Sequence, residues 1–340
     1  MQRTTPQEII VLGAGHFGTC LAQHLAELGH EVTLWARSKT ICEAINHSKR
    51  NPKYLSNIKL HEQISAVHVL KPEVLKDFST IVVAIPTQHI REVIKAVSSG
   101  IQTNQLLISA AKGIEQNSLC LPSEILAETL GERSRTMAAY LSGPSFASEV
   151  AEGQPTAVTM ASYDKDCANK AQKIFHAPNF RVYTSQDPIG IGIAGALKNV
   201  VAIAAGACVG LGFKANASSA LITRGLAEIA RLGVALGANP ITFKGLGGVG
   251  DLFLTCSSKK SRNYTVGYRL AKGDHLKDIV ETLGSVAEGI ATTKAAYQLG
   301  MSHGVRLSIT TAVYQVLYEG LQVNEVVQQL LHASARQEFE

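Results

Sequence analysis

Short apolar runs alternate with longer amphipathic segments over the first half of the chain. The runs predict strands at residues 8–12, 31–36, 67–70, 80–85, 105–110, 137–141, 156–160 and 180–183. Residues 16–28 predict a helix that ends at Gly29, and residues 88–97 predict another. The run at 80–85 is continuously apolar and ends at Pro86, which is typical of a strand buried on both faces. Because strands and helices alternate, we expect a parallel, doubly wound sheet.

The pattern changes near residue 188. Beyond Asp187-Pro188 the strand signals fade, and Ala- and Leu-rich segments of helical length continue toward the C-terminus. We therefore expect two domains, an α/β domain over residues 1–188 and an all-α domain over residues 189–340. The residues from about Ser334 onward are expected to form a loose tail.

One apolar segment, residues 189–211, is long enough to span a bilayer. Lys198 and Asn199 lie near its centre, where a charge costs at least a few kcal/mol in lipid. Gly and Ala dominate the segment, and no aromatic belt flanks it. These features favour a helix buried in a large core over a membrane span.

Composition narrows the class of protein. The formal net charge is +5, but the basic residues are scattered, so the sequence does not favour a nucleic-acid partner. A mildly positive balance suits a small anionic substrate. The six cysteines form no CxxC pair, which indicates neither a zinc framework nor a disulfide scaffold. Reduced thiols and a polar segment at residues 1–8, without the apolar core of a signal peptide, predict a cytoplasmic protein.

The first chemical motif is Gly13-Ala14-Gly15-His16-Phe17-Gly18, which follows a predicted strand and opens a predicted helix. Gly13 permits a tight turn, Gly15 lets the backbone approach a pyrophosphate, and Gly18 lets the helix pack on the strand. The N-terminus of the helix then offers N–H groups to the phosphates. The motif therefore predicts a Rossmann-type dinucleotide-binding domain, the alternative being a glycine turn that binds nothing.

The end of the second predicted strand bears on the choice of cofactor. NAD-selective sites usually have an acid there, but this chain reads Trp35-Ala36-Arg37-Ser38-Lys39. Arg37 could pair with a 2′-phosphate and stack on the adenine. We therefore expect NADP(H), with NAD(H) also accepted, unless Arg37 is only a solvated surface residue.

Two lysines are candidates for the chemistry. Lys112 follows the strand at 105–110, at the sheet edge where ligands bind in such folds. Lys198 is the single charge in some twenty apolar residues, so it should be paired or have a lowered pKa. A lysine tuned in this way can exchange a proton with an alcohol or ketone near neutral pH. The alternative is a structural lysine that is paired with a carboxylate.

A glycine-rich segment at residues 247–264 supplies further candidates. Its glycines precede Asp251, which suggests a rigid turn that places a carboxylate. Ser261, Arg262 and Asn263 put a hydroxyl, a guanidinium fork and an amide side by side, a set that suits a phosphate monoester. The serines and lysines at 257–260 are better explained as a polar surface turn.

Several ordered segments give the chain a close family resemblance. They are VLGAGHFGTCLA, AAKGIE at 110–115, LSGPSFASEV at 141–150, ALKNVVAIAAG at 196–206, GGVGDLFLTCSSKKSRNYTVG at 247–267 and VAEGIATT at 286–293. Together they resemble the NAD(P)-dependent glycerol-3-phosphate dehydrogenase family of bacterial type, from Ile9 to about Leu331. The resemblance implies an active site between the two domains and supply of glycerol 3-phosphate for phospholipids. A homodimer through the helical domain is also expected.

The resemblance assigns roles position by position. It implies that Lys198 is catalytic and that no metal is needed. The implied substrate contacts are Lys112, Gly143, Ser145, Lys198, Asp251, Ser261, Arg262 and Asn263. The motifs themselves predict Gly13, Gly15, Gly18 and Arg37 as cofactor contacts, and the resemblance adds His16, Phe17, Lys112, Ala147, Arg262, Val286 and Glu288. His16 departs from the family, whose members often have Ser there, and Phe17 stands where Trp is frequent, so the pyrophosphate contacts differ in detail.

Two other functions fit parts of the pattern. A related dehydrogenase of β-hydroxyacids or sugar acids would need a carboxylate-binding site in place of the phosphate site. A non-catalytic NADP-binding sensor would bind cofactor tightly without turnover and would not need Lys198. The combination of Lys198, Asp251 and Arg262 argues against the sensor.

Overall fold

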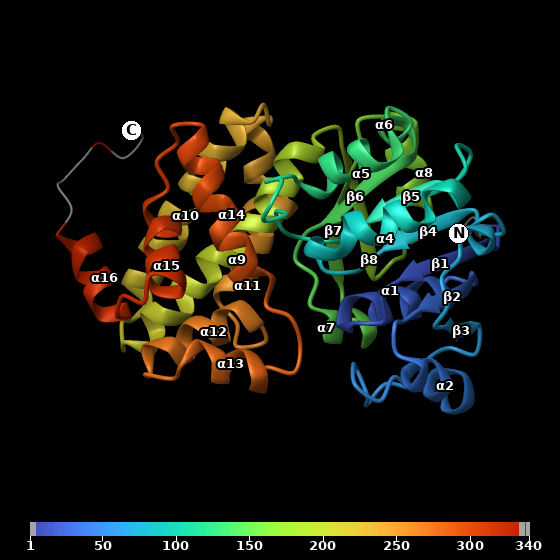
Figure 1. Cartoon of the computed structure of the whole chain (residues 1–340), viewed down its shortest axis with the longest axis horizontal. Helices are drawn as coiled ribbons and strands as arrows, with labels where there is room; N and C mark the ends of the chain where they lie inside the picture. Colours follow the sequence, from blue (N-terminus) through green and yellow to red (C-terminus); the bar gives the residue numbers. More distant parts are fainter. Residues whose placement is uncertain (1–4, 333–336, 338–340) are drawn as a thin grey trace.

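The computed structural model describes residues 5–332 and Gln337. Figure 1 shows a sheet-containing domain (blue to green) beside a domain built of helices (yellow to red). The predicted tail from Ser334 lies outside the described residues except at Gln337.

One eight-stranded sheet organises the first domain, in the order β3-β2-β1-β4-β5-β6-β7-β8. Its strands are β1 (Glu8–Leu12), β2 (Glu31–Trp35), β3 (Ile64–Val67), β4 (Thr80–Val83), β5 (Leu106–Ser109), β6 (Ala138–Ser142), β7 (Thr156–Ala161) and β8 (Phe180–Ser185). The predicted doubly wound sheet is confirmed. It is parallel except where β7 runs antiparallel to β6, a pairing that the alternation pattern did not reveal.

Helices cover both faces of this sheet because its central strands are apolar on both sides. Ile9 and Val11 of β1 pack into one core with α1 (His16–Glu27), α2 (Lys39–Ser48) and α8 (Lys165–Phe175). Ile10 and Leu12 pack into a second core with α4 (Ile90–Val97) and α5 (Pro122–Leu130). Short helices α3 (Pro72–Leu75), α6 (Ser134–Met137) and α7 (Ala147–Ala151), with the 3₁₀ turns η1 (Thr87–His89) and η2 (Ser98–Gly100), complete the domain. The residues that directly follow β1, β4 and β5 line the cleft described below.

The helical domain is built around α9 (Pro188–Gly210). The helices α10 (Ala215–Ala235), α11 (Asp251–Cys256), α12 (Arg262–Ala271) and α14 (Glu288–Ser302) pack against it. The remaining elements are η3 (Pro240–Lys244), η4 (Leu246–Gly250), α13 (Leu276–Thr282), α15 (Ser308–Tyr318) and α16 (Val323–Leu331). The apolar stretch of α9 is 83% buried inside the protein, so the expected buried helix is confirmed.

Glycines let α12 approach α9 at backbone distance. A Cβ atom at Gly206 of α9 would stand 1.9 Å from the carbonyl oxygen of Tyr264, and one at Gly267 of α12 would stand 1.8 Å from that of Ile203. Any larger residue would separate the two helices. This close packing matters because α9 and α12 both contribute residues to the site described below.

The strand predicted at residues 67–70 was wrong by three positions. The structure pairs Ile64–Val67 with Val32–Trp35, and the chain leaves the sheet at His68. Pro72 then opens α3, so the apolar residues just before it belong to a connection. The strand predicted at residues 8–12 matches β1 at both ends, and the remaining predicted strands differ from the observed ones by one or two residues at one or both ends.

Candidate active site

The glycine turn after β1 has the geometry that the motif requires. Gly13 has a positive φ of 116°, and a Cβ atom at Gly18 would lie 1.8 Å from the carbonyl oxygen of Gly13. At Gly15, which precedes α1, no atom of the described chain lies within 4 Å of the place where a Cβ would project. Nor does any described side chain cap this helix. The free N–H groups and the open approach at Gly15 fit a pyrophosphate.

A buried asparagine braces this turn from a loop that the sequence analysis did not interpret. The amide of Asn51 donates to the carbonyl oxygen of Ala14 at 3.0 Å and to Oγ1 of Thr19 at 2.9 Å. The same loop brings the ring of Tyr54 edge-on to His16, with ring centroids 5.0 Å apart. Burial lowers the pKa of His16, and the nearby positive charge of Arg262 lowers it further. The histidine is therefore mainly neutral at physiological pH.

A cleft of about 730 Å³ runs from this turn into the helical domain. It is lined by most of the residues that the sequence predicted as a site: Gly13, Gly15, His16, Phe17, Arg37, Lys112, Ser145, Ala147, Lys198, Asp251, Ser261, Arg262, Asn263, Val286 and Glu288. Two predicted residues do not line it. Gly18 lies behind the turn, and Gly143 presents its carbonyl oxygen to Lys112 and Ser145 from beneath.

At the inner part of the cleft one carboxylate lies between two lysines. Nζ of Lys198 donates to Oδ1 of Asp251 at 2.5 Å, and Nζ of Lys112 donates to Oδ2 at 2.9 Å. Lys198 also donates to Oγ1 of Thr255 at 3.1 Å. All four side chains are largely buried. Because an ammonium has three protons, Lys198 keeps one that can point into the cleft.

This arrangement sets the protonation of the site. Burial and the charge of Lys112 lower the pKa of Lys198 while Asp251 opposes them, and the net result is a pKa of about 8. Burial would raise the pKa of Asp251, but the two lysine charges outweigh burial and hold it below its usual value. Asp251 is thus a carboxylate, and Lys198 exchanges its proton close to physiological pH.

The glycine-rich segment explains how Asp251 reaches this position. Residues 246–250 form a wide turn, η4, in which Gly248 leaves helical geometry, and Asp251 then opens α11. A Cβ atom at Gly248 would stand 2.2 Å from the carbonyl oxygen of Phe243. The predicted rigid turn is therefore present, and it aims the carboxylate at α9.

The serine, arginine and asparagine at 261–263 are brought together at the start of α12, but they have different surroundings. Oγ of Ser261 accepts from the backbone N–H of Tyr264 and caps the helix. Arg262 donates to Oγ of Ser285 at 2.9 Å. The amide of Asn263 donates to Asn199 of α9 and accepts from the N–H of Gly289 of α14, so it ties three helices together. Ser261 and Asn263 thus bond to the helices themselves, whereas Arg262 bonds to Ser285, a loop residue that also lines the cleft.

Glu288 joins the two domains across the cleft. Its Oε1 accepts from the backbone N–H of Thr87, which follows β4, at 3.2 Å. Burial raises the pKa of Glu288 to about 7. A Cβ atom at Gly113 would stand 2.8 Å from both the Glu288 carboxylate and the Thr87 hydroxyl, so a larger residue there would displace these two side chains.

Several cleft residues were missed by the sequence analysis. Tyr54 and Lys53 follow Asn51-Pro52, a dipeptide that signals a turn but not a ligand contact. Thr255 stands one helical turn after Asp251, and that spacing alone could have placed it beside Lys198. Ser285 belongs to a loop with no local signal.

The fold and the cleft define a class of protein. A glycine turn at the carboxyl edge of a parallel sheet, opposite a buried lysine from a helical domain, is the arrangement of a nicotinamide-dependent dehydrogenase. Within residues 5–332 and Gln337, no three His, Cys, Asp or Glu side chains are grouped so that they could hold a metal ion.

Comparison with known proteins identifies the family. The models for the N-terminal and C-terminal parts of NAD-dependent glycerol-3-phosphate dehydrogenase match residues 8–168 and 187–328. The chain belongs to this family. It is 46% identical to the glycerol-3-phosphate dehydrogenase [NAD(P)+] of Limosilactobacillus reuteri (98% of this chain, 99% of the relative) and 45% identical to that of Bacillus subtilis (98% and 96%). The crystal structure of glycerol-3-phosphate dehydrogenase from Coxiella burnetii superposes with a TM-score of 0.91 at 34% identity, covering 96% of this chain and 99% of that one.

Proposed function

We propose that this chain interconverts sn-glycerol 3-phosphate and dihydroxyacetone phosphate with NADP(H) or NAD(H). The observation that supports this most strongly is the buried Lys198–Asp251–Lys112 arrangement, which lies in one cleft with the glycine turn and Arg262. Family membership supports the same reaction. The cofactor, when bound, supplies or accepts the hydride.

Lys198 exchanges a proton with the oxygen on C2 of the substrate. In the reducing direction its free N–H donates to the substrate C2 oxygen and the proton follows as the alcohol forms. In the oxidising direction neutral Lys198 takes the hydroxyl proton. Asp251 and Thr255 accept from the other two N–H groups, which fixes the ammonium in one orientation.

Arg262 binds the substrate phosphate. Its fork matches two phosphate oxygens, and both Arg262 and its hydrogen-bond partner Ser285 line the cleft. We propose that Ser261, Asn263, Lys112, Ser145 and the backbone of Gly143 complete the substrate contacts. At the other end Arg37, His16, Phe17 and Ala147 contact the dinucleotide, while Val286 and Glu288 adjoin its nicotinamide end.

The metabolic role of the enzyme depends on which of the two compounds is its product in the cell. We propose that reduction is the biological direction and that the glycerol 3-phosphate supplies phospholipid synthesis. Six unpaired cysteines support a location in the cytoplasm. We also propose that the enzyme is a homodimer, with residues 1–188 and 189–340 as its two domains.

Substitution of Arg262 tests the substrate assignment. In R262Q the KM for dihydroxyacetone phosphate should rise ~10- to 100-fold, because a charged hydrogen-bonded contact is lost. Turnover of dihydroxyacetone, which has no phosphate, should change little. R269Q is the matched control, since Arg269 lies on the same helix but pairs with Asp274. An equal loss with both substrates in R262Q would contradict phosphate recognition by this residue.

A further inference from the structure

The loop that joins α2 to β3, residues 49–63, contributes to one wall of the cleft. Lys53 and Tyr54 of this loop line the cleft together with His16 and Arg37. Both lie within a connection and not within a helix or strand, so no ladder of backbone hydrogen bonds holds them in place. Their position over the cofactor site therefore depends on how the loop is attached to the rest of the domain.

Asn51 attaches this loop to the glycine turn. Its side chain is fully buried, and its Nδ2 donates to the carbonyl oxygen of Ala14 at 3.0 Å and to Oγ1 of Thr19 at 2.9 Å. Its Oδ1 accepts from the backbone N–H groups of Lys53 and Tyr54, each at 3.1 Å. A side-chain amide has two protons to donate and two lone pairs to accept with, and Asn51 uses all of them. One side chain thus ties the turn to the backbone of the two loop residues that line the cleft.

Ring contacts extend this connection to the charge of Lys53. The ring of Tyr54 lies edge-on to His16 with centroids 5.0 Å apart, and Nζ of Lys53 lies 5.5 Å from the centroid of the Tyr54 ring. A cation at this distance from an aromatic ring is attracted to it. The ammonium of Lys53 is therefore held near the part of the cleft that begins at His16, where a pyrophosphate would approach the turn.

A pyrophosphate needs positive charge that the turn does not supply. Residues 13–18 contain no lysine or arginine, and His16 is mainly neutral. Lys53 is exposed, and over residues 5–332 no carboxylate lies within ion-pair distance of it. Lys59 of the same loop, by contrast, pairs with Glu62 at 3.3 Å. Because a pyrophosphate is negatively charged on both phosphates, the uncompensated ammonium of Lys53 suits it.

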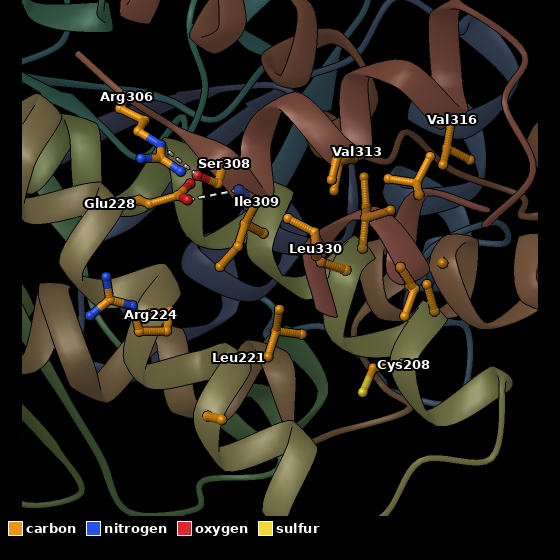
Figure 2. Close-up of a pocket in the computed structure, with 18 of the residues that line it drawn as sticks. Cys208, Leu221, Arg224, Glu228, Arg306, Ser308, Ile309, Val313, Val316 and Leu330 are labelled. Carbon is orange, nitrogen blue, oxygen red and sulfur yellow. Dashed lines mark hydrogen bonds between the residues drawn. The ribbon is translucent and has the colours of Figure 1, made fainter. Parts of the chain in front are cut away.

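A second large hollow offers a phosphate no such group. It measures about 910 Å³ and lies in the helical domain, between α9, α10, α15 and α16 (Figure 2). Its lining is mostly apolar, and two of its arginines are engaged within the chain: Arg231 donates to the carbonyl oxygen of Arg306, and Arg306 donates to Ser308. A ligand that carries phosphates is therefore matched better by the cleft.

We infer that Lys53 is a further contact of the cofactor pyrophosphate and that Asn51 positions it, by coupling the loop to the glycine turn. This inference rests on the proposed use of NADP(H) or NAD(H) and adds residues to that site. Asn51 does not line the cleft, so it acts through the backbone of Lys53. Because both cofactors contain the pyrophosphate, Lys53 contributes to the binding of both, whereas Arg37 contributes to NADPH alone.

Cofactor titration of two lysine variants tests the contact. In K53Q the Kd for NADPH and the Kd for NADH, measured by fluorescence, should rise alike by ~3- to 30-fold, because a charged contact to phosphate is lost. K59Q is the matched control and should stay within ~2-fold of wild type, as expected for an exposed ion pair. The kcat of K53Q at saturating NADPH should match that of the wild type. Unchanged affinity in K53Q, or a loss confined to NADPH, would overturn the pyrophosphate contact.

A double-mutant cycle tests the positioning role of Asn51. N51A should raise the Kd for both cofactors, and adding K53Q should then raise it by less than ~2-fold more, because Lys53 is already displaced. N46A is the matched control. Asn46 bonds to both backbone groups of Ala66 in β3, so its loss should lower the melting temperature and leave both Kd values unchanged. Additive losses from N51A and K53Q would show that Asn51 only stabilises the fold and would contradict the positioning role.

T19V carries the same cycle if N51A does not fold. Valine has nearly the shape of threonine, and the substitution removes one partner of Asn51 while its bonds to the loop remain. We expect the same non-additivity with K53Q, and additivity would contradict the coupling. These titrations need no turnover. A protein that binds both cofactors but does not reduce dihydroxyacetone phosphate would contradict the proposed function alone, whereas unchanged binding by K53Q in an active enzyme would contradict only the inference about Lys53.

Discussion

Lys198 and Asp251 come from different helices, 53 positions apart, and their side chains meet at 2.5 Å in the protein interior. Burial lowers the pKa of Lys198 and the carboxylate of Asp251 raises it, and with the charge of Lys112 the pKa is lowered to about 8. A buried pair tuned in this way is suited to proton transfer. The following predictions test that role and the surroundings on which it depends.

Replacement of Lys198 by methionine should remove catalysis without removing the cofactor site. K198M keeps most of the side-chain volume, and Asp251 keeps Lys112 as its partner. We expect kcat to fall ~10²- to 10⁴-fold, the range found when a general acid is lost. The Kd for NADPH, measured by fluorescence titration, should stay within a few-fold of wild type. Parallel losses in kcat and in NADPH affinity would show that Lys198 acts mainly on binding.

The pH profile should report the Lys198 pKa and respond to its two neighbours in opposite directions. Ketone reduction needs protonated Lys198, so log kcat/KM should fall as pH rises through about 8. Removing the carboxylate in D251N should move this break to lower pH. Removing the second positive charge in K112M should move it to higher pH. A break that stays in place in both variants would assign it to another group.

Two substitutions in the glycine turn should have separate effects, one on the affinity for NADPH and the other on the stability of the fold. G15A adds a methyl group that meets no described atom, at a φ of −73° that alanine accepts, so the melting temperature should not change. The methyl group would stand where the pyrophosphate approaches, so the Kd for NADPH should rise at least ~10-fold. G18A forces a methyl group onto the backbone of Gly13 and should destabilise the fold by about 2 kcal/mol or more. Tight NADPH binding by G15A would mean that the cofactor lies elsewhere.

Arg37 should determine the preference between NADPH and NADH. It lines the cleft at the end of β2, where it can reach a 2′-phosphate. In R37Q the KM for NADPH should rise ~10-fold or more, and the KM for NADH should change little. K39Q is the control, because Lys39 is nearby but pairs with Glu43 at the surface. Equal effects on both cofactors would contradict a role in 2′-phosphate recognition.

Glu228 should make the fold less stable as pH rises toward neutrality. Burial raises its pKa from 4.5 to about 7, so between these values the folded state holds a proton that the unfolded state has lost. The free energy of unfolding should therefore fall by up to ~3 kcal/mol over that window because of this group. The difference between wild type and E228Q, followed by urea titration at several pH values, isolates the effect. A pH-independent difference would contradict it.

Local patterns were sufficient to predict most of the sheet and the cofactor turn. Each of these features depends on short-range rules: apolar runs for buried strands, and glycines where a Cβ has no room, as at Gly13 and Gly18. The antiparallel β6–β7 pair and the early start of β3 depend on which strand lies alongside, which periodicity does not contain. The sequence therefore predicted a parallel sheet throughout and placed the third strand three residues too late.

Site residues could be predicted from the sequence where their residue type differs sharply from that of their neighbours along the chain. Lys198 in an apolar helix and Asp251 after a glycine cluster were such cases, and the structure pairs them. Tyr54 and Thr87 were not anomalous in their own loops: the fold alone brings Tyr54 to the cleft and the backbone N–H of Thr87 to Glu288. Residue type and the family resemblance predicted Asn263 as a substrate contact, but neither indicated that its amide links α9, α12 and α14.

The most direct test is the oxidation of NADPH, and in parallel NADH, by the purified protein with dihydroxyacetone phosphate. Rapid loss of NADPH absorbance that requires the phosphate group, and is absent with β-keto acids, is the expected result. Binding of NADPH without oxidation of either cofactor would contradict the proposed reaction and would favour a cofactor sensor. Turnover confined to the keto acids would instead identify a dehydrogenase of carboxylate substrates.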